Sequence, residues 1–574
     1  MAKSSLVNSG ISHALLPQQG LASRCRRPLR LLIILWVALL VSCDSATEQP
    51  SVEASGTRYL GIEQDSGVQA FLGIPFAEPP VNELRWERPV PIQGSLGDVN
   101  ATQFMPACMQ TGSGLAWYHG MMSRVGVDPS LMEGPEYSED CLYLNVWTTG
   151  DHSEAKPVLV FIHGGSNTGG WSYEPNYHGY ALAKRGVVVV TVAYRLGVFG
   201  WLSHPDMAIR NPGLHDLIVA LDWVNANISA FGGDPNRVVV SGESAGADNA
   251  LHLALAPAMA GKLAGVIHQS AGWSVTSTLK PEDGFVLGEA LVAHHFGADG
   301  NFADLKQIPV AELLDSQLDV FSGHYFSPIP DPETLPVSLE ETVAGDSLPG
   351  LNLIIGSNRN ESLMYIPEGA ELTDYLERYF PPETWGDIKV MLGTDQPELA
   401  QMDRLRSAVQ YTCPSLALAE AAHEAGGAAY VYRFDRVREG FDAIGAYHGA
   451  ELPYVFDTHD PWMPTTVVDQ QVTDALVDYW VAFLTTSSPN ESRSGRTETD
   501  GTETVPPETN SSEMASLETS GLELNSAEKG RAIWPAWTQQ QQALVIADEI
   551  STQTHPDVAL CEFLNAAQVA SARH

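Results

Sequence analysis

The chain of 574 residues carries a formal charge of −39 at pH 7, and 44% of its residues are hydrophobic. This hydrophobic content suffices for a large core, so one big α/β domain accounts for the length. Nucleic acids and anionic lipid surfaces repel so acidic a protein, which disfavours both as partners, and a solvated acidic surface explains the charge better than a site that attracts cations.

Residues 1–42 have the pattern of an export signal. Four arginines precede an apolar run at 31–41, which is shorter than the about 20 residues that a membrane-spanning helix needs. The sequence Leu40-Val41-Ser42-Cys43 resembles the lipobox of bacterial lipoproteins, in which the cysteine is acylated and becomes the new N-terminus. We therefore expect an exported protein that is anchored to a membrane through a lipid on Cys43. A plain secretory signal, which would leave the protein secreted, and an uncleaved anchor are the alternatives.

Cleavage before Cys43 would make the mature protein more acidic. Residues 1–42 contain Lys3 and four arginines but no acidic residue, so the remaining chain would carry −39 − 5 = −44. Residues 43–56 indicate only a short polar tether, and order is expected to begin near Thr57.

Short apolar runs bounded by turn residues mark the first predicted strands, which are residues 59–62, 68–74, 157–162 and 186–192. A helical pattern follows at 214–224. This alternation predicts a central, mostly parallel sheet with helices on both sides. In such a sheet, ligands bind beyond the carboxyl ends of the strands.

The next predicted strand, at 238–240, leads into a candidate nucleophile. The strand ends in Gly242-Glu243-Ser244-Ala245-Gly246, and helix-forming residues follow at 247–256. Glycines two residues either side of a serine let strand and helix approach closely while the hydroxyl stands exposed, as a nucleophile elbow requires. The pattern favours Ser244 as a nucleophile, and an ordinary strand-to-helix turn is the alternative.

Several longer stretches resemble the type-B carboxylesterase and cholinesterase family, whose members have the α/β-hydrolase fold. The matching stretches are residues 75–80, 84–86, 138–146, 163–165, 194–200 and 231–235. The likeness covers most of residues 57–487 and resumes near 533. It implies one α/β-hydrolase domain at 57–565, followed by a tail at 566–574, and hydrolysis of small-molecule esters without a cofactor.

The resemblance supplies the acid of a catalytic triad. A serine needs an adjacent base, and the base needs a carboxylate that fixes its tautomer. In α/β-hydrolases these follow the serine in the order acid, then histidine. Glu361 lies just past the strand-like run 351–355 and matches the glutamate of the family's Gly-x-Asn-x-Asp-Glu-Gly motif, from which Asn360 and Ser362 depart. A surface glutamate is the alternative.

The base is assigned in the same way. His448 stands in a glycine-flanked loop after the strand-like run 429–434 and matches the family's His-Gly-x-Glu-Leu stretch. A buried structural histidine is the alternative. The resemblance therefore implies a triad of Ser244, Glu361 and His448.

Preset donors are needed for the negative charge that develops on a carbonyl oxygen. The glycine-rich stretch at 163–166 follows a predicted strand, and by resemblance the oxyanion hole uses the N–H groups of Gly165, Ser166 and Ala245. Many relatives have glycine or alanine in place of Ser166. Its larger side chain narrows the site and puts activity toward bulky or tertiary-alcohol esters in doubt.

The cysteines indicate two disulfides. If Cys25 and Cys43 are set aside, an even number of cysteines remains for the exported chain, namely Cys108, Cys141, Cys413 and Cys561. Four cysteines can pair in three ways. The family resemblance favours Cys108 with Cys141 and Cys413 with Cys561. No Cys-x-x-Cys pair or histidine cluster accompanies them, so no metal site is expected. By the same resemblance, Arg85 with Glu139 and Arg195 with Asp216 form buried ion pairs.

Residues 489–530 differ from the rest of the chain. They are rich in Ser, Thr, Glu, Gly and Pro and nearly lack aromatic and β-branched apolar residues, so they cannot bury enough surface to fold. We expect a disordered insertion at the surface, with a role as a partner's ligand as the alternative.

Three aromatic residues and one tryptophan bear on substrate preference. Phe321, Tyr325 and Phe326 occupy the region that shapes the acyl pocket in relatives, which fits small or aryl acyl groups, although core packing explains them equally well. Trp117 stands at a different offset from the tryptophan that binds choline in cholinesterases, so a choline-ester specialist is disfavoured.

We therefore predict an exported, membrane-anchored serine carboxylic-ester hydrolase. The alternative of another class is an adhesion or binding protein on the same fold, which usually lacks a triad residue. An amidase or carbamate hydrolase would share the same site.

Overall fold

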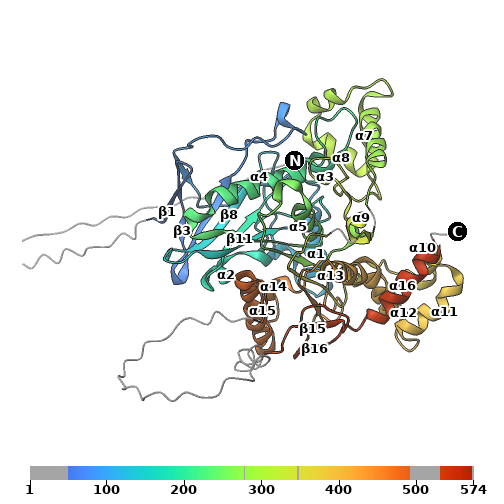
Figure 1. Cartoon of the computed structure of the whole chain (residues 1–574). Helices are drawn as coiled ribbons and strands as arrows, with labels where there is room; N and C mark the ends of the chain where they lie inside the picture. Colours follow the sequence, from blue (N-terminus) through green and yellow to red (C-terminus); the bar gives the residue numbers. More distant parts are fainter. Residues whose placement is uncertain (1–48, 277, 346–347, 491–530, 572–574) are drawn as a thin grey trace, which may run out of the picture. The chain divides into compact units, whose positions relative to one another are not determined.

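The computed structural model describes residues 49–276, 278–345, 348–490 and 531–571 (Figure 1). The predicted export signal, Cys43, the first part of the tether and residues 491–530 of the predicted insertion lie outside these ranges. Within the described ranges, no helix is both long and apolar enough to span a membrane.

Eleven strands form one sheet in the order β16-β15-β14-β13-β12-β11-β9-β10-β8-β4-β3. The seven neighbouring strands β15-β14-β13-β12-β11-β9-β10 pair in parallel. Antiparallel strands complete the sheet at both edges, β16 beside β15 and β8, β4 and β3 beyond β10. The predicted mostly parallel sheet is thus confirmed. Its strands are β3 (Ile62–Glu63), β4 (Val68–Pro75), β8 (Tyr143–Thr149), β9 (Lys156–Ile162), β10 (Val188–Val192), β11 (Gly233–Glu243), β12 (Gly265–Gln269), β13 (Leu353–Asn358), β14 (Ala429–Phe434), β15 (Gln542–Ile546) and β16 (Ile550–Thr554).

Two small sheets accompany the large one. Their strands are β1 (Ser51–Ala54), β2 (Thr57–Leu60) and β5 (Asp98–Asn100) in one, and β6 (Ala107–Cys108) and β7 (Tyr137–Ser138) in the other. The helices are α1 (Ser113–Arg124), α2 (Tyr180–Lys184), α3 (Gly197–Trp201), α4 (Pro212–Asn227), α5 (Ala245–Leu255), α6 (Trp273–Thr276), α7 (Pro281–Phe296), α8 (Val310–Val320), α9 (Leu339–Ala344), α10 (Leu372–Tyr379), α11 (Trp385–Leu392), α12 (Glu398–Ser407), α13 (Cys413–Glu424), α14 (Leu452–Val455), α15 (Val467–Thr486) and α16 (Val558–Ser571).

The central strands are buried on both faces, which explains their continuous apolar sequences. In β9, Val158 and Val160 point into one core, whereas Leu159 and Phe161 point into the other. Successive side chains of a strand alternate between faces, so a single strand supplies both cores. Helices α4 and α5 cover one face, and α2, α14 and α15 cover the other (Figure 1).

The predicted start of the ordered chain was wrong. The polar tether was expected to reach residue 56, but Ser51–Ala54 form β1, which pairs antiparallel with β2. Val52 and Ala54 pack into the hydrophobic core while Ser51 and Glu53 face solvent, so the apolar alternation outweighs the polar composition. Helix α16 continues to Ser571, within the predicted C-terminal tail.

Candidate active site

Ser244 occupies the turn between β11 and α5, as the sequence predicts. Its backbone has φ 57° and ψ −131°, a conformation that costs energy for a residue other than glycine. A Cβ atom on Gly242 would collide with the backbone of Gly246, and one on Gly246 would collide with the carbonyl oxygen of Ile162. Both glycines are therefore required by close packing of strand and helix, which presents the serine at the sheet edge.

Glu361 and His448 meet in the structure although 87 residues separate them. Nδ1 of His448 lies 2.6 Å from Oε2 of Glu361, and the other carboxylate oxygen accepts a hydrogen bond of 2.6 Å from the N–H of Asn358. Both side chains are buried. The carboxylate thus fixes the orientation of the ring, with Nε2 on the side away from Glu361.

The topology of the sheet explains this meeting. Ser244 follows β11, Glu361 follows β13 and His448 lies in the loop after β14. These strands belong to one parallel set, in the order β11-β12-β13-β14, so their carboxyl ends share one edge. A β-bridge between Asn360 and Tyr447 holds the last two loops side by side.

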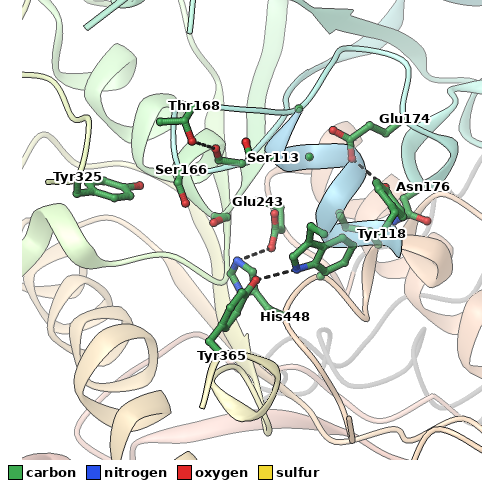
Figure 2. A pocket seen from close by; sticks show the side chains of 18 of the residues that line it. Ser113, Tyr118, Ser166, Thr168, Glu174, Asn176, Glu243, Tyr325, Tyr365 and His448 are labelled. Atoms are coloured by element: carbon green, nitrogen blue, oxygen red, sulfur yellow. Dashed lines mark hydrogen bonds and ion pairs between the residues drawn. The ribbon is translucent and has the colours of Figure 1, made fainter. Parts of the chain in front are cut away.

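Sequence reasoning missed one buried group in this site. Oε1 of Glu243, the residue directly before Ser244, lies 3.1 Å from Nε2 of His448 (Figure 2). His448 therefore lies between two carboxylates, those of Glu243 and Glu361. The only sequence signal was the acidic residue inside the Gly-x-Ser-x-Gly motif, and its side-chain direction depends on packing that the motif does not encode.

These carboxylates change the proton affinity of the site. Burial alone would lower the pKa of His448, but the negative charges of Glu243 and Glu361 outweigh it and raise the pKa to about 9. Burial raises the pKa of Glu243 to about 8, although the adjacent His448 opposes this. The pair therefore retains protons to higher pH than either group would in water.

The three predicted oxyanion donors lie around the serine. Gly165 and Ser166 have positive φ angles of 98° and 57°, which turn the backbone after β9 toward the cavity that Ser244 lines. Ala245 is the first residue of α5. Within the described residues, no acceptor is bonded to the N–H groups of Gly165, Ser166 or Ala245.

A cavity of about 620 Å³ opens over Ser244. Tyr325 lies on one side of His448, and Tyr118 and Glu174 lie on the other (Figure 2). The indole N–H of Trp117 donates to the Tyr365 hydroxyl at 2.9 Å, which joins two further wall residues. The size of the cavity, and a wall that combines several aromatic side chains with polar ones, suit a small organic molecule.

Of the three aromatic residues expected at the acyl pocket, Tyr325 alone lines this cavity among the described residues. Phe321 and Phe326 are buried and stack on each other, with ring centroids 4.9 Å apart. Core packing, the alternative to a substrate contact, therefore explains both phenylalanines.

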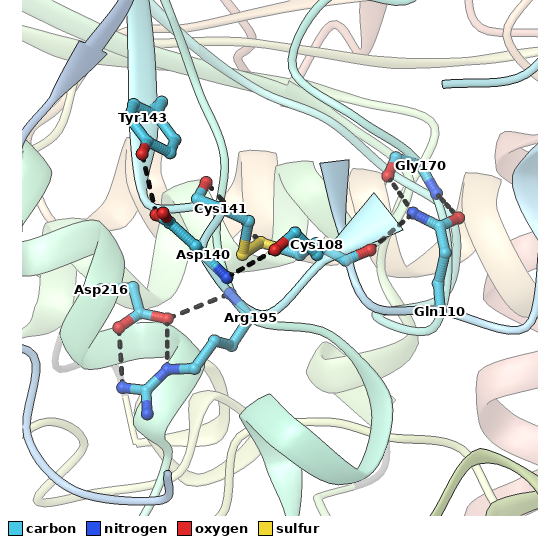
Figure 3. Close-up of a disulfide and its surroundings, with 9 residues drawn as sticks. Cys108, Gln110, Asp140, Cys141, Tyr143, Gly170, Arg195 and Asp216 are labelled. Atoms are coloured by element: carbon cyan, nitrogen blue, oxygen red, sulfur yellow. Dashed lines mark hydrogen bonds and ion pairs between the residues drawn. A yellow bond between two sulfur atoms is a disulfide. The ribbon is translucent and has the colours of Figure 1, made fainter. Parts of the chain in front are cut away.

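Both predicted disulfides are present, Cys108–Cys141 and Cys413–Cys561. The first closes the loop that carries α1 and hence Trp117 and Tyr118 of the cavity wall. Figure 3 shows how Gln110 joins this loop to Gly170, the N–H of which donates to Gln110 at 3.1 Å while its carbonyl accepts at 2.8 Å. The disulfide loop thus supports the glycine-rich loop beside the serine.

The two predicted ion pairs are also present. Arg195 donates to both oxygens of Asp216, at 2.8 and 2.7 Å, beside the Cys108–Cys141 disulfide (Figure 3). Arg85 forms a similar two-bond pair with Glu139, at 2.6 and 2.7 Å. Both pairs lie outside the cavity and act on structure. In the described ranges, no cluster of His, Cys, Asp and Glu side chains could hold a metal ion.

Comparison with known proteins identifies the family of this chain. The profile of the carboxylesterase family matches residues 48–382 and 388–554. The chain belongs to the carboxylesterase family. Para-nitrobenzyl esterase of Bacillus subtilis is 31% identical over 453 residues, which cover 74% of this chain and 88% of the relative. Fumonisin B1 esterase of Sphingopyxis macrogoltabida is 31% identical over 423 residues, covering 70% and 74%.

The fold of this carboxylesterase matches solved structures of the family. A structure named PNB esterase superposes with a TM-score of 0.70 and 26% identity, covering 90% of this chain and 100% of the other. The protein is thus a carboxylic-ester hydrolase with the α/β-hydrolase fold, which confirms the predicted fold class and enzyme class.

Proposed function

We propose that this carboxylesterase hydrolyses small-molecule esters through an acyl-enzyme, with Ser244, His448 and Glu361 as its triad. Oγ of Ser244 attacks the ester carbonyl carbon while Nε2 of His448 takes the hydroxyl proton. His448 then gives that proton to the leaving alcohol. Water attacks the acyl-enzyme, again with His448 as base, and releases the acid and free Ser244.

The N–H groups of Gly165, Ser166 and Ala245 would stabilise the oxyanion in both steps. Their lack of acceptors among the described residues supports this role. Backbone donors of this kind remain whatever the side chain, so Ser166 in place of a smaller residue keeps the hydrogen bond. Its Cβ and hydroxyl limit the space for the alcohol, which favours primary over tertiary alcohol esters.

The observation that carries the triad is the 2.6 Å contact between His448 and Glu361 at the edge where Ser244 stands. Initial rates with p-nitrophenyl acyl esters of increasing length test it. Ser244→Ala should lower the rate about 10⁶-fold, to background, while Ser123→Ala, an exposed serine on α1, should keep it. A folded wild-type protein that hydrolyses none of these esters would favour a binding protein on the same fold.

We also propose that the enzyme is exported and anchored through a lipid on Cys43. The arginines, the apolar run and the lipobox-like sequence support this. In cells that make lipoproteins, the wild type should partition into the detergent phase of a detergent-phase separation, and Cys43→Ser should not. Cys25→Ser, inside the proposed signal, is the control. Equal partitioning of Cys43→Ser and wild type would contradict the lipid anchor.

A further inference from the structure

Arg406, near the end of α12, lines the same cavity as Ser244. Among the lining residues in the described part of the chain, it is the one lysine or arginine. The protein has a net charge of −39, so a fixed positive charge inside its active-site cavity is unusual, and the contacts of Arg406 indicate what this charge can bind.

The contacts of Arg406 leave its guanidinium group incompletely bonded. Nη1 lies 3.5 Å from the carbonyl oxygen of Tyr365, a long hydrogen bond, and Cζ lies 5.9 Å from the Tyr375 ring centroid. Its Nε is buried and has no hydrogen-bond partner within the described residues. By contrast, Arg404 on the same helix donates from Nε and Nη2 to Asp557, at 3.0 and 2.8 Å.

A buried donor without an acceptor costs free energy that a bound ligand can recover. The planar guanidinium presents parallel N–H groups whose spacing matches the two oxygens of a carboxylate. Within the described residues, no carboxylate of the protein lies within ion-pair distance of Arg406. The unmet donor in the cavity therefore points to an acceptor that arrives with the ligand.

The acidic residues of the cavity do not suggest a cationic ligand instead. Glu174 already accepts hydrogen bonds from the Tyr118 hydroxyl, at 2.8 Å, and from the N–H of Trp171, at 3.0 Å. Burial raises the pKa of Glu174 to about 6. Glu243 is engaged by His448. Each of these carboxylates therefore has a partner within the protein, whereas Arg406 has no ion-pair partner among the described residues.

We propose that Arg406 binds an ionised carboxylate on the substrate, so that this site prefers esters that carry a second, free carboxyl group. This inference rests on the proposed ester hydrolysis at Ser244. Tyr365, which Arg406 contacts, has its ring centroid 6.0 Å from that of His448. Tyr365 therefore links Arg406 to the reacting centre, and a flexible spacer must connect the ester to the carboxylate.

Two matched substrates test this proposal. One is the mono-p-nitrophenyl ester of adipic acid, and the other is its neutral analogue, in which the free carboxyl is a primary amide. The four-methylene spacer limits attack of the carboxylate on its own ester, which would raise the background. The measured quantity is the ratio of kcat/KM for the acid to kcat/KM for the amide, which cancels general effects on the enzyme.

For the wild type, the ratio should exceed one despite the negative net charge. Arg406→Met should lower it about 10- to 100-fold, the range expected for a lost charge-assisted hydrogen bond. Arg406→Lys keeps the charge without the two-pronged geometry and should recover part of the ratio. Arg378→Met, on α10 and outside the cavity lining, should leave the ratio at the wild-type value.

The outcomes separate the two proposals. Hydrolysis of the amide analogue with an unchanged ratio in Arg406→Met overturns carboxylate binding and leaves ester hydrolysis standing. No hydrolysis of either ester by the folded wild type overturns the proposed function itself. If Arg406→Met folds poorly by thermal melting, Arg406→Gln, which keeps a polar side chain of similar reach, gives the same ratio test.

Discussion

Nε2 of His448 lies 3.1 Å from Oε1 of Glu243, the residue directly before the nucleophile. In the proposed mechanism, Nε2 is also the atom that takes the proton of Ser244. Glu243 is buried, as is Glu361, whose carboxylate contacts Nδ1 of the same ring. The base therefore works beside two carboxylates, and its readiness to accept a proton depends on both.

This arrangement predicts an alkaline shift of the pH profile. His448 acts as a base only when neutral, and its pKa is raised to about 9, so kcat/KM should rise with pH and reach half its maximum above the ordinary histidine value. Glu243→Gln removes one of the charges that raise this pKa and should move the midpoint to lower pH. Glu174→Gln, which alters a carboxylate that does not contact the ring, should move the midpoint less.

Measurement of kcat/KM for p-nitrophenyl acetate from pH 5 to 10 checks this prediction. An unchanged midpoint in folded Glu243→Gln would show that Glu243 does not influence the titration of His448.

Glu361→Gln tests the other side of the ring. The amide keeps the volume but presents N–H donors, so it can hold His448 in the tautomer that has a proton on Nε2, which cannot serve as base. We expect kcat to fall about 10⁴-fold. The exposed Glu377→Gln is the control. A decrease of less than tenfold, with thermal stability retained, would argue against Glu361 as the orienting acid.

Much of the site was predictable because its signals are local. Strand, turn and helix around Ser244 are encoded within about twenty residues, and the loops of Glu361 and His448 carry family motifs. Parallel pairing then brings three strand ends to one edge without further information. The disulfide pairs and the two buried ion pairs were likewise available from the resemblance.

What the sequence did not reveal depends on packing between distant segments. Nothing near Arg406 in sequence indicates that its guanidinium faces the cavity, because the neighbouring Arg404 has the same residue type and forms an ion pair elsewhere. The direction of the Glu243 side chain depends on its contact with His448, which is distant in sequence. Strand β1 needs β2 as a partner before its alternation has any effect.

The elbow glycines should tolerate no side chain. Gly246→Ala places a Cβ against the backbone of Ile162, which cannot move without displacing β9. We expect the free energy of unfolding to fall by about 1–3 kcal/mol and esterase activity to fall with it. Gly120→Ala, on the exposed face of α1 with no atom within 4 Å of the added carbon, should instead stabilise by about 0.5–1 kcal/mol.

Chemical denaturation and ester hydrolysis of the two alanine variants, measured side by side, check this contrast. Equal stability of both variants would mean that strand β9 and helix α5 can separate more easily than their contact indicates.

The ion pair of Arg195 and Asp216 should matter for stability, not chemistry. Their side chains are 3% and 0% exposed, so Asp216→Asn leaves a guanidinium buried without its counter-charge. We expect a loss of about 3–5 kcal/mol in the free energy of unfolding. Asp98→Asn breaks the pair with Arg58, whose side chains are 51% and 61% exposed, and should change stability by less than about 1 kcal/mol. Urea unfolding curves give both values. Similar losses of stability in the two variants would show that solvent or local rearrangement compensates the buried charge of Arg195. A loss of kcat in folded Asp216→Asn would instead show that the ion pair helps to position the active site through the adjacent disulfide loop.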